Sequence, residues 1–406
     1  MIHLHVWLRT LAADLLHVGE IRVAEPDPRL GGLLRGEFRY DSGFLDRSDA
    51  FALDPIHLPL TPMVQKAERP QAGIHGCFED SLPDAWGRGL LIRSHRLPRA
   101  RQTPPHLLAR LGSDGLGALA YTTGPEAPSP SSAEPTRDLE GLIEAAERYD
   151  QDPGALSPDD LAQLFRAASS PGGARPKLVL SEGGEGRIAK LASARDPVDM
   201  VRIEAACLSL ARDAGLDVPG FRVATVGRHS ALLLERFDQT TAGGRYPVLS
   251  LQTLTGAEGY YQLGYADLAD CLRRVGARPE IDLPALYRQM TFNAVLGNTD
   301  DHLKNFAVRH EAVGWRLTPA FDRLPDVLGR GEHCLHFGSA GYSPTAAAVR
   351  GLAGAFGISL PRARGLVDEV VAALAGWRAR FADFGVPEAD CDRLGRDIER
   401  RLSGYR

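Results

Sequence analysis

The chain has 406 residues, which is too long for one hydrophobic core and predicts two or three folded units. Its composition, 44% hydrophobic and 24% charged, is that of a globular protein, and a formal net charge of −5 argues against direct binding of nucleic acid. Five scattered cysteines without a C-x-x-C pair, and no apolar run long enough for a membrane span, exclude a disulfide scaffold and favour a cytoplasmic protein.

Residues 1–123 predict a small, mainly β domain. Short runs of alternating apolar and polar residues lie between glycines and prolines, which is typical of strands joined by turns. We expect strands at 2–9, 20–24, 37–40 and 118–122, and a helix at 83–95. His3 and His5 share one face of the first strand, and we interpret them as structural.

Residues 136–240 follow a linker rich in Pro, Ser, Ala and Glu, and predict a second unit. After two short helical patterns, the order is a hairpin at 177–191, a helix at 199–214 and a hairpin at 221–237. Residues 241–406 are then mostly helical, apart from a strand pair near 305–317.

The densest polar cluster runs from Gly297 to Phe306, between a helical run and a strand. Read alone, it could be a solvated turn. The chemistry of phosphoryl transfer would explain the spacing of these polar residues. In such enzymes one Asp takes the substrate hydroxyl proton, an Asn in the same loop binds Mg²⁺, and a later Asp completes the metal site. Asp300, Asn305 and Asp322 fit these roles. Asp301 leaves the choice of base open, although the spacing to Asn305 favours Asp300.

A glycine-rich segment opens the first hairpin. Its backbone N–H groups can approach phosphate oxygens without obstruction, although it lacks the Walker A pattern and could be an ordinary loop. The nucleotide-binding candidates in and after this segment are Gly172, Gly173, Ala174, Arg175 and Lys177.

Five further residues are candidates for the ATP site. Lys190 lies on the next strand and Glu204 on the following helix, the order in which kinases place their Lys–Glu pair. Glu235 and Phe237 end the second hairpin, where the backbone could bind an adenine edge, or where charged residues could simply face water. Lys304, in the polar loop, is assigned to the same site.

These parts, in this order, resemble the HipA family of toxin kinases from bacterial toxin–antitoxin systems. The family-like segments are Ser81–Arg88, Leu111–Leu119, Gly172–Lys177, Glu235–Asp238, Asn298–Phe306 and Thr318–Asp322. The resemblance implies an α+β, two-lobed protein-kinase-like fold, here divided into an N-terminal mainly-β domain at 1–123, an N-lobe-like part at 136–240 and a helical C-lobe at 241–406.

The resemblance also implies roles for individual residues. Asp300 is expected to be the catalytic base, with His302 as a support in the catalytic loop. Asn305 and Asp322 are expected to bind Mg²⁺, and Lys190 the α- and β-phosphates of ATP.

An inhibitory autophosphorylation site is also implied, at Ser170 or its neighbour Ser169. A phosphate adds about −1.5 to −2 charges, which would repel ATP from the loop that must hold it.

The implied substrate is an aminoacyl-tRNA synthetase, the glutamyl enzyme first, phosphorylated on serine or threonine to stall translation. The implied partner is a HipB-type helix-turn-helix antitoxin, through which any contact with DNA would be indirect. Three alternatives remain: a small-molecule phosphotransferase of the antibiotic-kinase kind, a catalytically silent kinase-like binding protein, and a metal-dependent phosphohydrolase using Asp300, Asp301 and His302.

Overall fold

The computed structural model describes residues 1–25, 33–67, 72–129, 139–168, 175–182, 185–259 and 261–406. Within these ranges, no helix is both long and apolar enough to cross a membrane. The chain divides into two compact units, the first comprising Met1–Ala194, Val226–His229 and Glu235–Leu249, and the second Arg195–Thr225, Ser230–Leu234 and Ser250–Arg406. The three-part division at 1–123, 136–240 and 241–406 stays a prediction.

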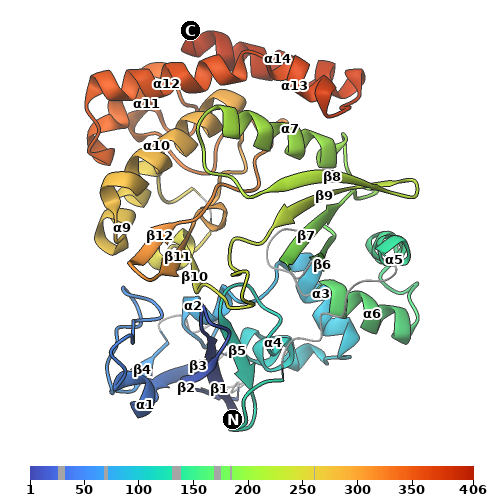
Figure 1. The fold of residues 1–406 in the computed structure, drawn as a ribbon, viewed down its shortest axis with the longest axis vertical. Coiled ribbons are helices and arrows are strands. Elements are labelled where there is room, and N and C mark those ends of the chain that lie inside the picture. The colour runs from blue at the N-terminus through green and yellow to red at the C-terminus, as the bar shows by residue number, and fades with distance from the viewer. Residues whose placement is uncertain (26–32, 68–71, 130–138, 169–174, 183–184, 260) are drawn as a thin grey trace. The chain divides into compact units, whose positions relative to one another are not determined.

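The first unit contains an antiparallel five-stranded sheet in the order β4-β3-β2-β1-β5 (Figure 1). Its strands are β1 Ile2–Arg9, β2 Leu15–Ala24, β3 Arg35–Tyr40, β4 Gln65–Lys66 and β5 Leu119–Thr122. The strands expected from the alternating pattern are therefore confirmed, with β2 beginning five residues earlier than predicted.

The two faces of this sheet differ in polarity because side chains alternate along each strand. Leu4, Val6 and Leu8 of β1 are almost fully buried on the core face. His3, His5 and Trp7 alternate with them on the opposite face. The alternating pattern of β1 in the sequence thus indicates a strand with one face packed in the core and one polar face.

Several helices complete the first unit, together with the hairpin β6–β7. They are α1 Ser42–Leu45, α2 Gly76–Glu79, α3 Ala85–Ser94, η2 Arg99–Arg101, α4 Pro104–Leu111, α5 Leu139–Gln151 and α6 Pro158–Ala168; the hairpin strands are β6 Lys177–Glu182 and β7 Glu185–Leu191. Helix α4, which packs against β1 and β5, was not predicted. The two prolines at its start have the pattern of a loop. Proline is nevertheless favourable in the first turn of a helix, because the N–H groups there have no hydrogen-bond partner within the helix.

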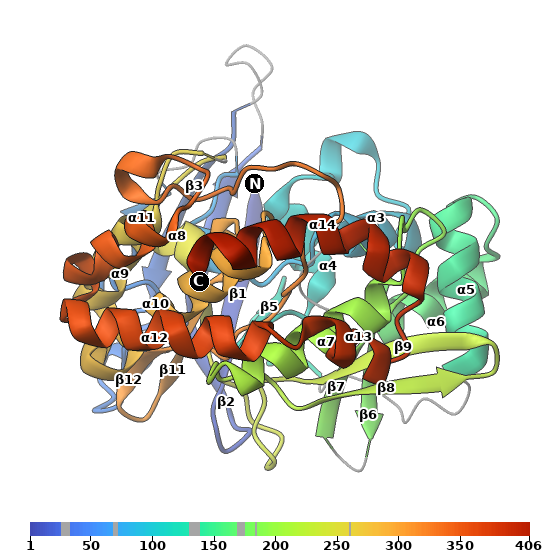
Figure 2. The same cartoon turned by 90° about the horizontal axis from the view of Figure 1, so that it is seen from above.

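The second unit is mainly helical, and the helix α10 lies at its centre. Its helices are α7 Met200–Asp213, α8 Leu251–Thr255, α9 Tyr265–Val275, α10 Pro279–Leu296, η3 Leu303–Asn305, η4 Gly338–Ala340, α11 Ala346–Gly351, η5 Leu352–Phe356, α12 Leu360–Leu374, α13 Trp377–Asp383 and α14 Glu388–Tyr405. Helices α9, α12 and α14 pack on α10, and Figure 2 shows α12 beside α14.

The remaining strands are short. β11 Ala307–Glu311 and β12 Gly314–Leu317 form an antiparallel hairpin in the second unit. β8 Phe221–Val226 and β9 His229–Glu235 are neighbours in one sheet, and β10 is Val248–Ser250. The expected hairpins at 221–237 and 305–317 are confirmed, although β11 begins at Ala307 because the preceding residues form the 3-10 turn η3.

Candidate active site

The polar loop Gly297–Phe306 connects α10 to β11 in the second unit. Gly297 ends α10 in a left-handed conformation, with φ of +82°, and both its N–H and that of Asn298 donate to the carbonyl of Asn293. A Cβ at Gly297 would also lie 2.7 Å from Nε of Arg401. Only glycine satisfies both conditions, so the helix ends here and the chain turns into the loop.

The two adjacent aspartates of this loop have opposite environments. The side chain of Asp301 is fully buried. Its Oδ2 accepts hydrogen bonds from the Tyr265 hydroxyl at 2.7 Å and from His333 Nδ1 at 2.9 Å. Its Oδ1 accepts from the backbone N–H of Cys334 at 2.7 Å. A carboxylate enclosed by donors in this way is a structural anchor for the loop.

The donors around Asp301 are held in their donating forms. Burial, followed by the charge of Asp301, raises the pKa of Tyr265 well above its ordinary value, so that its hydroxyl keeps the proton that it donates. Arg401 Nη1 lies 3.4 Å from Nε2 of His333. Since an arginine can only donate, Nε2 accepts and Nδ1 carries the proton that reaches Asp301.

Asp300, in contrast, faces solvent, with 58% of its side chain exposed. Its Oδ1 forms an ion pair of 2.6 Å with Nη1 of Arg330, which is 41% exposed. The side-chain amide of Asn305 donates to the backbone carbonyl of Asp300 at 2.7 Å. The residue predicted as the base and the residue predicted as a metal ligand are therefore hydrogen-bonded to each other. Of the two aspartates, Asp300 has the accessible carboxylate, and its role as the base stays a prediction.

Arg330 was not identified from the sequence. Its segment is fixed by Asp326, whose carboxylate accepts the backbone N–H groups of Arg330 at 3.0 Å and Gly331 at 2.7 Å. Arg401 of α14 donates to the carbonyl of Gly331 at 3.2 Å. These contacts hold Arg330 beside Asp300. Nothing in the local sequence signals this, because the two residues lie 30 positions apart.

Asp322 is tied to the same loop through its backbone. Its φ is +53°, a left-handed conformation that aspartate tolerates better than most residues. Asn298 Nδ2 donates to its carbonyl at 3.3 Å and to Oδ1 of Asn293 at 3.2 Å. A strained conformation at a predicted ligand is often a feature of a functional site.

A buried arginine connects the segment that carries Asp322 to α10. Arg323, which is fully buried, donates to Oδ1 of Asn293 at 2.9 Å and to Oε1 of Gln289 at 2.8 Å. Its guanidinium lies 5.2 Å from the ring centroid of Phe306. Because Asn293 and Gln289 belong to α10, the helix fixes the segment that carries Asp322.

The other two candidates in the loop lie in and next to η3. His302 is the residue before η3, is partly exposed, and its carbonyl accepts the backbone N–H of Asn305 at 2.9 Å. Lys304 is exposed. Their assignments as loop support and nucleotide contact stay predictions.

The predicted phosphate-binding residues belong to the first unit. Ser169, Ser170, Gly172, Gly173 and Ala174 lie outside the described residues, while Arg175 is partly buried just before β6. Lys177 and Lys190 are directly opposite each other in the β6–β7 ladder, so both side chains leave the same face of the hairpin. Two ammonium groups therefore belong to the same face of the hairpin.

Glu204 belongs to α7 in the second unit and is buried, with 3% of its surface exposed. Since Lys190 and Glu204 lie in different units, their pairing stays a prediction. Glu235 is exposed, and Arg187 Nη1 lies 3.3 Å from its Oε1. Phe237 is partly buried. The adenine contact assigned to these two residues is also still a prediction.

The segment after Glu235 contains a buried ionic cluster. Arg236 donates to Asp238 at 2.6 Å, and Arg245 lies 3.4 Å from the same carboxylate. The N–H of Gly117 also donates to Asp238, at 2.8 Å, and Arg236 donates to the carbonyl of Gly115 at 3.3 Å. The cluster thus anchors this segment to the Gly115–Gly117 turn.

These contacts explain why Asp238 stays ionised inside the protein. Burial alone would raise its pKa, but the charges and hydrogen bonds of Arg236, Arg245 and Gly117 lower the pKa to about 2. The sequence analysis named both segments, Leu111–Leu119 and Glu235–Asp238, but it did not predict the contact between them.

Comparisons with known proteins show the family of the chain. The family described as the HipA-like C-terminal domain matches residues 169–377, and the one described as the HipA N-terminal domain matches residues 17–122. Y4mE of Sinorhizobium fredii, which is named as a kinase, is 29% identical over 343 residues, covering 74% of this chain and 76% of Y4mE.

A solved structure shares the fold. It is HipA of the Shewanella oneidensis MR-1 toxin–antitoxin system, in a complex with HipB and operator DNA. The similarity has a TM-score of 0.71 at 18% identity and covers 98% of this chain and 96% of that one. The expected α+β kinase-like fold is therefore confirmed.

Proposed function

The chain belongs to the HipA family of toxin kinases, and from this premise we propose that it is a Mg²⁺-dependent protein Ser/Thr kinase with Asp300 as its base. The observation that carries the proposal is the separation of the two loop carboxylates: Asp301 is enclosed by donors, and Asp300 is left accessible. A general base must reach the proton that it removes, which a buried and saturated carboxylate cannot do.

Asn305 and Asp322 suit a Mg²⁺ ion by the chemistry of their donor atoms. Mg²⁺ prefers oxygen ligands, commonly one or two carboxylates together with substrate phosphates. Because Nδ2 of Asn305 is used by the carbonyl of Asp300, its Oδ1 is the atom left to bind a cation. Bound Mg²⁺ supplies neutralisation of phosphate charge. The contacts of Asn298 and Arg323 hold the segment of Asp322 in place.

In this proposal the protein side chains orient and deprotonate the substrate. Asp300 accepts the proton of a serine or threonine hydroxyl as the oxygen attacks the γ-phosphorus, and the phosphoryl group leaves ADP for that oxygen. Arg330 must release or share Oδ1 of Asp300 for this step. His302 supports the loop, and its carbonyl holds the N–H of Asn305.

The cationic face of the β6–β7 hairpin is assigned to the ATP phosphates. Lys177 and Lys190 leave the same face of the hairpin, which places two positive charges there for the phosphate oxygens. The glycine-rich segment with Arg175 would add backbone N–H groups, Lys304 a further charge, and Glu235 and Phe237 the adenine contacts. Glu204 is assigned to orient Lys190.

The protein substrate is proposed to be an aminoacyl-tRNA synthetase, the glutamyl enzyme first, and the partner a HipB-type antitoxin. The HipA of Shewanella oneidensis was solved in a complex with HipB and operator DNA, which supports such a partner. The net charge of −5 agrees with contact to DNA only through that antitoxin.

The decisive experiment uses γ-labelled ATP with Mg²⁺ and compares the wild type with Asp300→Asn, with and without candidate synthetases. We expect label in the glutamyl enzyme or in the kinase itself, and a loss of roughly 10²–10⁴-fold in Asp300→Asn. Lys304→Ala in the same loop is a matched control, since a peripheral nucleotide contact should cost less than the base. Absence of label from every protein with the wild type would refute the kinase proposal.

Autophosphorylation of Ser170 is proposed as an internal switch. The added charge would repel the ATP phosphates from the segment that binds them. A Ser170→Glu variant should bind ATP more weakly and lose toxicity, with Ser169→Glu testing the neighbouring position. Full ATP affinity and toxicity in both variants would refute this switch without affecting the kinase proposal.

A further inference from the structure

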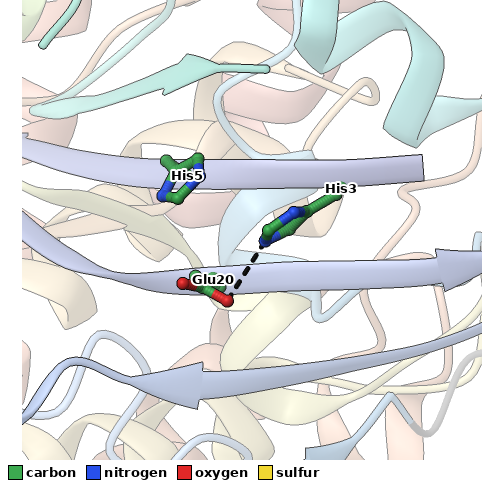
Figure 3. Close-up of side chains that lie close together, drawn as sticks. All are labelled: His3, His5 and Glu20. Carbon is green, nitrogen blue, oxygen red and sulfur yellow. Dashed lines mark hydrogen bonds and ion pairs between the residues drawn. The ribbon is translucent and has the colours of Figure 1, made fainter. Parts of the chain in front are cut away.

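The face of β1 and β2 opposite Leu4 and Val6 carries histidines and a glutamate that the kinase proposal does not use (Figure 3). His5 on this face is buried. His3 and His5 are two residues apart on β1 and therefore point to the same side. Glu20 lies directly opposite His5 in the β1–β2 register. His3 Nε2 is 3.1 Å from Glu20 Oε2, and one donor atom from each of the three residues lies within 4.8 Å of the others.

These separations are close to those of a zinc site. Bonds of about 2.0–2.2 Å in a tetrahedron place ligand atoms roughly 3.3–3.6 Å apart. The pair His3–Glu20, at 3.1 Å, is within about 0.2 Å of this spacing. The wider separations need to close by only about 1.5 Å, and the side chains of His3 and Glu20 are 38% and 23% exposed, which leaves them room to rotate. Two imidazoles with one carboxylate form a ligand set typical of zinc.

A second set of contacts orients His5. Its Nδ1 lies 3.2 Å from Nε2 of His17, and Nδ1 of His17 lies 3.4 Å from Oδ2 of Asp41. This leaves Nε2 of His5 for a metal. Histidine ligands of metals characteristically donate their other ring N–H to such a partner. A bulge, where the register shifts between Val6 and Trp7, brings His17 to the face that holds His5.

One oxygen of Glu20 already has a second donor beside it. Arg22 Nη2 donates to Glu20 Oε2 at 2.8 Å and would compete for this oxygen. Because the Arg22 side chain is 46% exposed, it can move to solvent at little cost.

We propose that the first unit binds one Zn²⁺ ion through His3, His5 and Glu20, with water in the fourth position. His17 and Asp41 hold the ring of His5. The site joins β1 to β2 and stabilises the sheet. It uses none of the residues assigned to phosphoryl transfer, so a result that refutes one proposal leaves the other unaffected.

The test is equilibrium dialysis of the full chain, prepared without a histidine tag and stripped with chelator, against Zn²⁺ alone. The wild type should bind one ion per chain, and His3→Gln and Glu20→Gln should bind it more than about tenfold more weakly. His95→Gln removes an exposed histidine outside the cluster and should bind like the wild type. Circular dichroism verifies that each variant is folded.

Thermal unfolding gives an independent readout. Zn²⁺ should raise the Tm of the wild type and of His95→Gln but not that of His3→Gln, because a ligand stabilises only the fold that binds it. Co²⁺ in place of Zn²⁺ should give visible bands typical of a four-coordinate site. No stoichiometric Zn²⁺ in the wild type, or wild-type affinity for Zn²⁺ in His3→Gln and Glu20→Gln, would overturn the proposal.

Discussion

Replacing Asp301 with asparagine should destabilise the protein far more than replacing its neighbour Asp300. Asparagine offers one oxygen to the donors around position 301 and turns an NH₂ group toward the others. If the oxygen keeps the N–H of Cys334, the amide N–H₂ faces the hydroxyl of Tyr265 and Nδ1 of His333. His333 cannot change tautomer freely, because Arg401 donates toward its other nitrogen.

The expected loss follows from these contacts. Two charge-assisted hydrogen bonds of about 1.5–3 kcal/mol each are removed, for a total of about 3–6 kcal/mol. In a unit of this size each kcal/mol lowers the Tm by roughly 2–4 °C, so Asp301→Asn should melt about 6–24 °C lower than the wild type. Asp300→Asn loses only an exposed ion pair, worth about 0–1 kcal/mol.

The assay pairs thermal unfolding with phosphoryl transfer at a temperature where all variants are folded. Asp300→Asn should keep its Tm and lose its activity, while Asp301→Asn should lose stability first and keep measurable activity while folded. Equal losses of Tm in the two variants, or a wild-type rate in Asp300→Asn, would refute the assignment of anchor and base.

Three further predictions concern the surroundings of these residues. Asp238 has a folded-state pKa of about 2, below its unfolded value, so its contribution of about 2 kcal/mol should be present above pH 4 and lost as the pH falls toward 2. Urea unfolding across this range should show a steeper slope in the wild type than in Asp238→Asn, where Glu20 and Asp397 still contribute. Asp322→Asn should raise the Mg²⁺ concentration needed for half-maximal activity with little change in stability, because asparagine tolerates the φ of +53°. Asp322→Ala should have the same effect on the Mg²⁺ requirement and should also cost about 1 kcal/mol of stability. An unchanged Mg²⁺ requirement in both variants would show that Asp322 is not a metal ligand. Arg330→Ala frees Oδ1 of Asp300 from its ion pair; kcat should rise about two- to fivefold, the equivalent of about 0.5–1 kcal/mol, and a fall in kcat would instead give Arg330 a role in the transition state.

The elements and the chemistry of the loop could be read from local patterns. The alternation in β1 and the short apolar run Met290–Leu296 at the end of α10 are properties of neighbouring residues, and Gly297 marks the end of that helix. The order of Asp300, Asn305 and Asp322 likewise depends only on positions in the chain. Helix α4 was missed because proline at a helix start has the same local signature as proline in a loop.

The sequence by itself determined which residues could do phosphoryl transfer, and it identified the family that the comparisons later showed. Only the tertiary structure decided which of two adjacent aspartates is accessible, because the donors that enclose Asp301 come from Tyr265 and His333, 36 and 32 residues away. The same holds for Arg330 beside Asp300 and for Glu20 beside His3, a contact that depends on the register of two strands. Spacing along the chain fixes the chemistry that is available, whereas burial and distant partners decide which group is free to use it.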